Sequence, residues 1–161
     1  MPVKAKLSSR IIDEKDKKIL EVLQENGREQ LNKIARKVGL SMDSTHKRIK
    51  VMIEKGIFQP TILIEPNALG YPLIADIKIK VKNVSQTELD KFIYHLKKHP
   101  RCTELLSIMG DYDFTLVLIA KTGDELNELS TEIRQKFKDL IAEWKSNLVL
   151  KAHKFEEYLL D

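Results

Sequence analysis

Two clusters of polar side chains in this 161-residue sequence have types and spacing suited to binding chemistry. The first cluster consists of Ser41, Asp43, Ser44, His46, Lys47, Arg48 and Lys50. It offers hydroxyl and carboxylate groups that can contact DNA base edges, and cations, including a protonated histidine, that can reach phosphates. The second cluster is the run Gly110-Asp111-Tyr112-Asp113, where glycine permits close approach to the backbone and the carboxylates can balance an ammonium group.

Motifs for catalysis and for cofactor or metal binding are missing from the sequence. It contains no Gly-rich phosphate loop, no paired His/carboxylate helix motif and no nucleophile elbow. Cys102 is the only cysteine, which is consistent with a reducing compartment. His95 and His99 have the i, i+4 spacing of a metal pair, but without a third ligand a solvated helix face is the better interpretation. We therefore expect no enzyme activity, no cofactor and no metal.

The first cluster must be positioned by helices, because apolar residues recur at helical spacing in the first sixty residues. Asp13 is a suitable N-cap for a helix that reaches Asn26, and Gly27 follows where a left-handed C-cap is expected. A second helix spans residues 30–38 and stops at Gly39, which permits a tight turn. A third helix follows across this turn, so the arrangement is that of a helix-turn-helix.

The third helix begins after Ser41, a suitable N-cap, and ends before Gly56. Successive rotations of 100° place Asp43 and Lys47 nearly opposite its apolar side. If this helix enters a major groove, its polar side faces the bases; a merely solvated helix face is the alternative. The predicted apolar side consists of Thr45, Ile49, Met52 and Ile53.

Charge is divided unevenly along the chain. Residues 1–60 carry 14 Lys/Arg against 8 Asp/Glu, a balance of +6, and residues 61–161 carry 14 against 16, a balance of −2. A basic N-terminal part predicts a polyanion-binding module joined to a module with another task. Lysines that merely keep the protein soluble are the alternative.

The second half alternates strand and helix patterns. The order β-α-β-β-α-β predicts a ferredoxin-like sandwich with both helices on one face of an antiparallel sheet, so the fold class is α+β. Apolar residues on the other face would leave an exposed patch, which predicts a homodimer. The expected strands cover residues 71–81, 103–109, 114–120 and about 146–155, and the helices follow the capping boxes Ser85/Glu88 and Thr122/Glu125.

From Ile12 to Lys154 the sequence resembles the Lrp/AsnC family of bacterial and archaeal transcription regulators. The matching motifs are Ile12-Asp13-Glu14-Lys15-Asp16-Lys17-Lys18-Ile19-Leu20, Leu23-Gln24-Glu25-Asn26-Gly27-Arg28, Ile34-Ala35-Arg36-Lys37-Val38-Gly39-Leu40-Ser41, Lys47-Arg48-Ile49-Lys50, Glu54-Lys55-Gly56-Ile57, Asn67-Ala68-Leu69-Gly70 and Gly110-Asp111-Tyr112-Asp113.

The resemblance implies three parts. Residues 1–58 are a winged or plain helix-turn-helix domain that binds double-stranded DNA. Residues 59–70 are a linker strand or hinge. Residues 71–161 form a domain that dimerises, assembles further, with a tetramer or an octamer as open alternatives to the dimer, and often binds an amino acid near the hairpin. The implied effector residues are Gly110, Asp111, Tyr112, Asp113 and Thr122.

Departures from the family pattern concern the hinge and the last strand. Thr45 replaces a buried Val or Ile, Val51 stands where relatives often carry a basic residue, and Pro60 withdraws a backbone donor from the linker. Residues 141–145 replace the usual Pro-Gly before the last strand, and a tail of residues 156–161 follows.

We expect a sequence-specific transcription regulator that responds to an amino acid and works in the cytoplasm on the nucleoid, away from membranes. One alternative is an architectural DNA-binding protein without an effector. A remote one is a related heme-biosynthesis decarboxylase, whose Arg-Asn-His-type motif is replaced here by Gly110-Asp111-Tyr112-Asp113. The hairpin as a purely structural turn also remains open.

Overall fold

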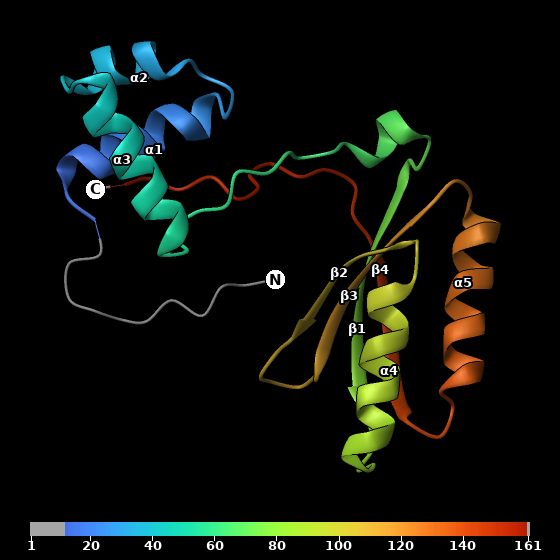
Figure 1. Cartoon of the computed structure of the whole chain (residues 1–161). Coiled ribbons are helices and arrows are strands. Elements are labelled where there is room, and N and C mark those ends of the chain that lie inside the picture. Colours follow the sequence, from blue (N-terminus) through green and yellow to red (C-terminus); the bar gives the residue numbers. More distant parts are fainter. Residues whose placement is uncertain (1–11, 161) are drawn as a thin grey trace. The chain divides into compact units, whose positions relative to one another are not determined.

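The computed structural model describes residues 12–160, which divide into two compact units (Figure 1). The first, here the helical unit, comprises residues 12–63 together with residues 154–160. The second, here the sheet domain, comprises residues 64–153. This division differs from the predicted one at the C-terminal end, because residues 154–160 group with the N-terminal helices.

Three helices form the helical unit: α1 (Glu14–Glu25), α2 (Leu31–Val38) and α3 (Met42–Glu54). Gly39 has a φ of 69°, in the left-handed region, so the tight turn predicted there between α2 and α3 is confirmed. The prediction that Gly27 is a left-handed C-cap of α1 is wrong. Asn26 caps the helix instead, in an extended conformation with a φ of −147°. Asn26 accepts the Arg28 amide through its side chain, which stabilises this ending without a left-handed residue.

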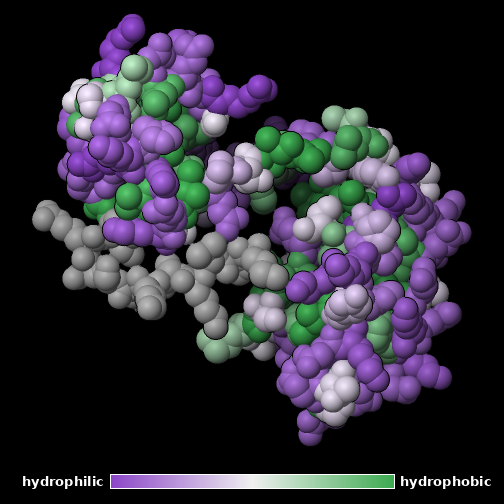
Figure 2. All heavy atoms as spheres, in the orientation of Figure 1, coloured by the Kyte–Doolittle hydropathy of each residue, from purple (hydrophilic) through white to green (hydrophobic). Residues whose placement is uncertain are grey.

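The helical unit has a small apolar core. Thr45 is fully buried and Ile49 is half-buried, as predicted, but Ile53 is exposed because the α3 surface turns to solvent there. The visible surface of this unit is largely hydrophilic in Figure 2. The buried cluster consists of Ile19, Val22, Ile34, Val38 and Met52.

The expected β-wing and linker strand are not formed. Residues 12–63 contain no strand, and between α3 and the sheet only a short 3-10 helix, Pro66–Leu69, is regular. A strand requires a hydrogen-bonded neighbour, and Pro60 cannot donate its backbone nitrogen to one. Residues 12–63 therefore form a helix-turn-helix without a wing.

The sheet domain follows the predicted order. Its elements are β1 (Leu73–Val81), α4 (Gln86–Lys98), β2 (Cys102–Ser107), β3 (Phe114–Ala120), α5 (Gly123–Lys136) and β4 (Ile141–Leu148). The strands are antiparallel in the order β2-β3-β1-β4, which confirms the ferredoxin-like sandwich. β4 begins five residues earlier than the predicted start near 146, because residues 141–145 already pair with β1.

Helices α4 and α5 both cover one face of this sheet (Figure 1). The buried residues of β1 and β3 on that face meet Phe92, whose ring contacts Phe114 and Phe137 edge-on at centroid distances of 5.8 and 5.0 Å. Such edge-to-face pairs add to the stabilisation from burial alone. Aromatic packing thus holds both helices to the sheet.

The opposite face of the sheet carries both charged and apolar side chains. Lys78 Nζ donates to Asp76 at 3.0 Å and to Thr115 Oγ1 at 3.0 Å, and Lys80 pairs with Glu143 at 3.8 Å. An apolar strip, Ile74, Val117 and Ile119, lies beside these groups on the same face, as the register of β1 with β3 shows. The open face of the sheet therefore has a charged part on β1 beside an apolar strip.

No helix in residues 12–160 is long and apolar enough to cross a membrane.

Candidate nucleic-acid interface

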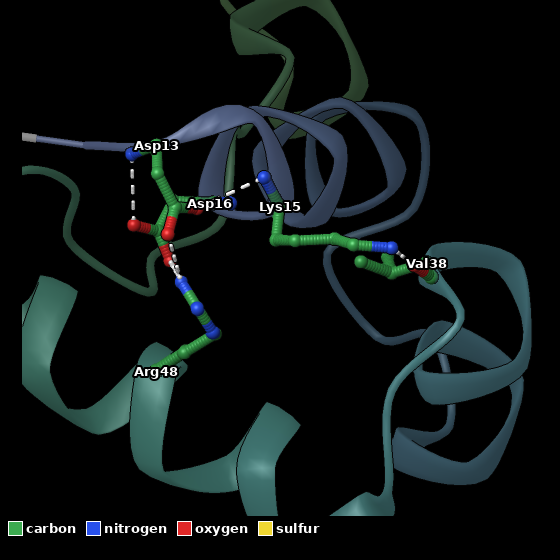
Figure 3. A network of polar contacts seen from close by, with 5 residues as sticks. All are labelled: Asp13, Lys15, Asp16, Val38 and Arg48. Carbon is green, nitrogen blue, oxygen red and sulfur yellow. Dashed lines mark hydrogen bonds and ion pairs between the residues drawn. The ribbon is translucent and has the colours of Figure 1, made fainter.

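The turn between α2 and α3 is fixed by contacts with α1. Lys15 Nζ donates to Val38 O at 2.5 Å, at the C-terminal end of α2 (Figure 3). A cation suits this position because the last carbonyls of a helix carry partial negative charge. The same ammonium group would lie 3.5 Å from a Cβ added at Gly39, so Lys15 also packs against the turn.

The first turn of α3 is closed by hydroxyl groups. Ser41 Oγ accepts the Ser44 amide at 3.1 Å, and Thr45 Oγ1 donates to Ser41 O at 2.9 Å. The fully buried Thr45 hydroxyl therefore has a partner, and the threonine keeps the β-branched shape that the core needs. Ser41 thus has a structural role as N-cap.

Arg48 connects α3 to the start of α1 (Figure 3). Its Nη1 lies 2.7 Å from Asp13 Oδ2 and 2.9 Å from Asp16 Oδ1. Asp13 is also the N-cap of α1 and accepts the amides of Lys15 and Asp16. The hydrogen bond from Arg48 holds the pKa of the Asp13 carboxyl below its ordinary value, and Asp13 in turn raises the pKa of the guanidinium.

This Arg48–Asp13–Asp16 group fixes the orientation of α3 on α1. The Arg48 side chain is 34% exposed, so it is not presented to solvent in the way that the neighbouring lysine is. The sequence predicts that Arg48 reaches a phosphate. In the structure, the carboxylates of Asp13 and Asp16 already pair with its guanidinium.

The outward side of α3 carries the remaining predicted residues. Lys47 pairs with Asp43 at 2.8 Å, and the two side chains are 73% and 75% exposed. Lys50 lies 3.9 Å from Glu54, and His46 and Ser44 are exposed. Exposed ion pairs are weak, so these cations can exchange a carboxylate for a phosphate at little cost.

Sequence reasoning missed three groups of this site. Lys15 and Asp16 belong to a motif of the family resemblance that assigns them no role, and only the fold shows that they hold the turn and Arg48. Arg36, exposed in the last turn of α2, adds a cation beside the turn. The concentration of basic residues at the end of α2 was the available signal for it.

The two aspartates of the hairpin, Asp111 and Asp113, differ in their hydrogen bonds. Asp113 Oδ2 accepts the Val81 amide at 2.8 Å, and the Asp113 amide donates to Ile79 O at 2.9 Å. Asp113 thus joins the hairpin to β1. Asp111 is exposed and has no hydrogen-bond or ion-pair partner within residues 12–160. Gly110 has a φ of 148° with open space around it, which leaves its backbone accessible.

Thr122 lies at the far end of β3 from the hairpin. β3 has seven residues, and at about 3.3 Å per residue its ends are about 20 Å apart. Thr122 is the N-cap of α5 and accepts the Glu125 amide at 3.1 Å, whereas the Glu125 carboxylate accepts the Lys121 amide, so the predicted capping box is only half formed. One protomer therefore does not bring Thr122 and the hairpin together.

His95 and His99 lie on α4 with ring centroids 6.0 Å apart. Lys136 Nζ is 3.1 Å from His95 Nδ1, and His95 Nε2 is buried without a partner among the described residues. Burial, followed by the charge of Lys136, lowers the pKa of His95. The described residues contain no group of three or more His, Cys, Asp or Glu side chains that could hold a metal ion.

Two family models match the chain. Residues 12–53 match the AsnC-type helix-turn-helix domain, and residues 74–159 match the Lrp/AsnC ligand binding domain. The two matches cover most of the 161 residues.

Curated relatives agree with these models. The chain is 35% identical over 150 residues to the HTH-type transcriptional regulator FL11 of Pyrococcus horikoshii, which covers 89% of this chain and 92% of the relative. It is 34% identical over 120 residues to the transcriptional regulator LrpA of the same organism, covering 74% of this chain and 83% of the relative.

Solved structures show the same architecture. A transcriptional regulator of Neisseria meningitidis in complex with L-Met has a TM-score of 0.80 at 25% identity, covering 89% of this chain and 93% of that one. Escherichia coli AsnC has a TM-score of 0.79 at 25% identity, covering 92% and 99%. The chain therefore belongs to the Lrp/AsnC family of DNA-binding transcriptional regulators and is a regulator rather than an enzyme.

Proposed function

We propose that the protein is a sequence-specific regulator that reads its DNA site with the outward side of α3. The observation that carries this proposal is that α3 has one buried side and one exposed polar side. Its inner side is buried at Thr45 and Met52 and clamped through Arg48, while Asp43, Ser44 and Lys47 project from the exposed side. A helix fixed in this way can present side chains to base edges in a defined register.

The residues near the start of α3 have the roles that their chemistry allows. Asp43 can accept a hydrogen bond from a cytosine amino group, and Ser44 can donate a hydrogen bond to a base edge or accept one from it. Lys47 and Lys50, four and seven residues beyond Asp43, supply cations to phosphates, and His46 does so when protonated. Arg36 on α2 extends this basic surface.

Arg48 acts in this proposal as a positioning residue. Its guanidinium is held by Asp13 and Asp16, so its contribution to DNA binding is the orientation of α3. Ser41 likewise contributes through the N-cap that it forms for α3.

Removing the Lys47 charge tests the phosphate role. Lys47→Ala is expected to weaken DNA binding and to lower the magnitude of the salt slope by about 0.9, the value for one phosphate contact. Lys91→Ala is the matched control, because it removes one exposed positive charge from α4. Affinity is measured by fluorescence anisotropy at several salt concentrations. Equal slopes for wild type and Lys47→Ala would remove Lys47 from the interface.

Substitutions of Asp43 and Ser44 test base reading. Asp43→Asn and Ser44→Ala should shift the preferred sequence selected from a random DNA pool, since each change alters the donor and acceptor pattern presented to the groove. An architectural protein would bind all sequences nearly equally. An unchanged preference in both folded variants would count against sequence reading by α3.

We further propose that the protein acts as a homodimer. Large apolar side chains are exposed on the sheet domain, including Leu106, Met109 and Leu150, and on the preceding segment at Ile62 and Leu63. Large exposed apolar side chains in such numbers are typical of surfaces that associate. Two reading helices would then address half-sites about one helical turn, or a multiple of it, apart. Further contacts between dimers would give a tetramer or an octamer.

Light scattering of the full chain tests the dimer. The mass should be at least twice that of the 18.6 kDa chain at micromolar concentration. Leu106→Asp should lower the mass if the open side of β2 is part of the contact, whereas Tyr94→Asp, an exposed position on α4, should not. A monomeric wild type would overturn the proposal.

We propose finally that an amino acid is the effector and that it binds at the hairpin. The matching family model is described as a ligand binding domain, and a solved relative is a complex with L-Met. Asp111 is the carboxylate available for the ammonium group, because Asp113 is engaged with Val81. Backbone N–H groups near Gly110 can receive the carboxylate, Tyr112 can pack over the side chain, and Thr122 could join only from another subunit.

Isothermal titration with the twenty amino acids tests this site. At least one should bind at millimolar affinity or better, and Asp111→Ala should weaken binding without changing the mass of the assembly. Asp124→Ala, which removes an exposed carboxylate from the start of α5, is the control. If none binds, or if Asp111→Ala binds as well as wild type, the hairpin is a structural turn.

A further inference from the structure

The C-terminal tail, residues 154–160, makes a paired contact with helix α1. Gln24 Nε2 donates to Tyr158 O at 2.8 Å, and the Tyr158 amide donates to Gln24 Oε1 at 3.0 Å. The two residues are 134 positions apart in the sequence. Both belong to the helical unit, and the red end of the chain lies beside α1 in Figure 1.

The contact resembles the hydrogen bonding of two backbone peptide groups on neighbouring strands. A carboxamide presents one donor and one acceptor side by side, so it can satisfy both backbone groups of a single residue. A carboxylate or an ammonium group at position 24 could not supply both, and a hydroxyl would have to do so from a single atom. The contact therefore depends on the side-chain carboxamide of Gln24, although it uses only the backbone of Tyr158.

The tail is bent toward α1 by its own residues. Glu156 has a φ of 46°, in the left-handed region that residues with a Cβ rarely adopt. Tyr158 Oη donates to Glu156 Oε2 at 2.5 Å across this bend. The bend and its side-chain bond lie within two residues of the Tyr158 peptide that meets Gln24. A left-handed conformation at a residue with a Cβ costs energy and persists only where the surrounding contacts hold it.

The chain therefore connects its two units twice. It passes from the helical unit to the sheet domain through residues 58–63, and it returns to the helical unit after residue 153. We propose that residues 154–160 form a releasable strap, closed by the Gln24–Tyr158 pair, that couples the sheet domain to the DNA-binding helices. Its hydrogen bonds lie at an exposed position, so they hold the strap weakly enough to open.

The strap has a direct consequence for DNA binding. With the strap closed, the helical unit is tied at two points and samples fewer orientations, so less freedom is lost when it settles on a site. Opening the strap should weaken binding to a site with two half-sites and increase the tolerance for altered half-site spacing. This consequence rests on the dimer proposed above, whereas the contact itself does not.

Hydrogen exchange tests the contact without DNA. In the full-length protein the Tyr158 amide should exchange about tenfold more slowly than in Gln24→Ala, the factor expected from two exposed hydrogen bonds. Glu21→Ala, at another exposed position of α1, should keep the protection. Equal exchange in wild type and Gln24→Ala would overturn the strap. Protection that disappears on dilution would also overturn it, because the tail would then belong to a second copy.

A double-mutant comparison tests the coupling. A chain that stops at Lys154 should bind a two-half-site DNA more weakly than wild type and should lose discrimination between spacings. In the Gln24→Ala background the same truncation should have little further effect, because the strap is already open. Equal effects of the truncation in both backgrounds would show that the tail acts without Gln24 and would contradict the strap. Circular dichroism confirms that each variant keeps its helices.

Discussion

The helical unit and the sheet domain are held together by different means. The buried cluster of the helical unit is small and purely aliphatic apart from Met52, and polar contacts from Arg48 and Lys15 cross between its helices. The sheet domain has a larger cluster in which Phe92 contacts two other aromatic rings. Small units bury a smaller share of their surface and depend more on directed contacts.

This difference matches the tasks of the two units. Apolar packing stabilises a fold but is tolerant of small rotations, whereas charged hydrogen bonds specify an angle. A reading helix has to keep its orientation, and α3 carries such bonds. We therefore expect the sheet domain to respond most to changes of side-chain volume and the helical unit to changes of polar partners.

The largest effect is expected from Phe92 in the sheet domain. Phe92→Ala removes a fully buried ring and should lower the free energy of unfolding by about 3–5 kcal/mol. Urea unfolding followed by the fluorescence of Trp144, the only tryptophan, reports on this domain because the indole packs against its core. Tyr94→Ala on the same helix, at an exposed position, should change stability by no more than about 0.5 kcal/mol. Similar losses of stability for both variants would contradict the view that buried side-chain volume stabilises the sheet domain.

An intermediate effect is expected from Arg48 in the helical unit. Because the ion pairs are partly exposed, Arg48→Met should lower the stability of this unit by only about 0.5–1 kcal/mol. DNA affinity should fall at the same time, with an unchanged salt slope, because the lost function is orientation rather than a phosphate contact. Arg48→Lys should recover the charge but only part of the affinity, since it cannot bridge both carboxylates equally.

The affinity and salt slope of the two Arg48 variants are measured beside Lys47→Ala. A fall of the slope by about one in Arg48→Met would identify a phosphate contact and would contradict the positioning role.

Acid should affect the sheet domain through its histidines. Burial lowers the pKa of His95 and His99 below the ordinary value of 6.5, so the unfolded chain binds their protons more readily than the folded chain does. Stability from this source is therefore present above pH 6.5 and decreases as the pH falls below that value. Protonation would also place a charge beside Lys136, which Glu132 only partly offsets.

Trp144 fluorescence melts between pH 7.5 and 5 should show this decrease in wild type. The double variant His95→Gln, His99→Gln should show a smaller decrease over the same range. An identical pH dependence in both proteins would exclude the histidine pair as its source.

The sequence predicts the elements well where local patterns determine them. Helix starts at Asp13, Ser41 and Ser85 follow from side-chain caps, and the order of strands follows from apolar alternation. Element ends that depend on distant partners were less accurate. β4 begins at residue 141 because β1 is available to pair with it, and residues 58–64 form no strand because the described chain offers them no such partner.

The candidate site shows the same limit. The exposed residues Asp43 and Lys47 could be assigned by rotation around a helix, which is a local property. The partners of Arg48 lie 32 and 35 residues away, and Gln24 meets Tyr158 only because the tail returns to α1. Sequence spacing alone contains no information on such contacts.

The smallest difference between two variants is expected in the hairpin, where neighbouring aspartates have different surroundings. Asp113→Ala removes the acceptor for the Val81 amide and should cost about 1 kcal/mol, because water can replace part of this exposed bond. Asp111→Ala removes a carboxylate without a partner in residues 12–160 and should change stability by less than about 0.5 kcal/mol. Urea unfolding of the two variants side by side measures the difference, and amide exchange at Val81 identifies its cause. If Asp111→Ala is the more damaging substitution, its carboxylate supports the hairpin, and the assignment of Asp111 to a ligand loses its basis.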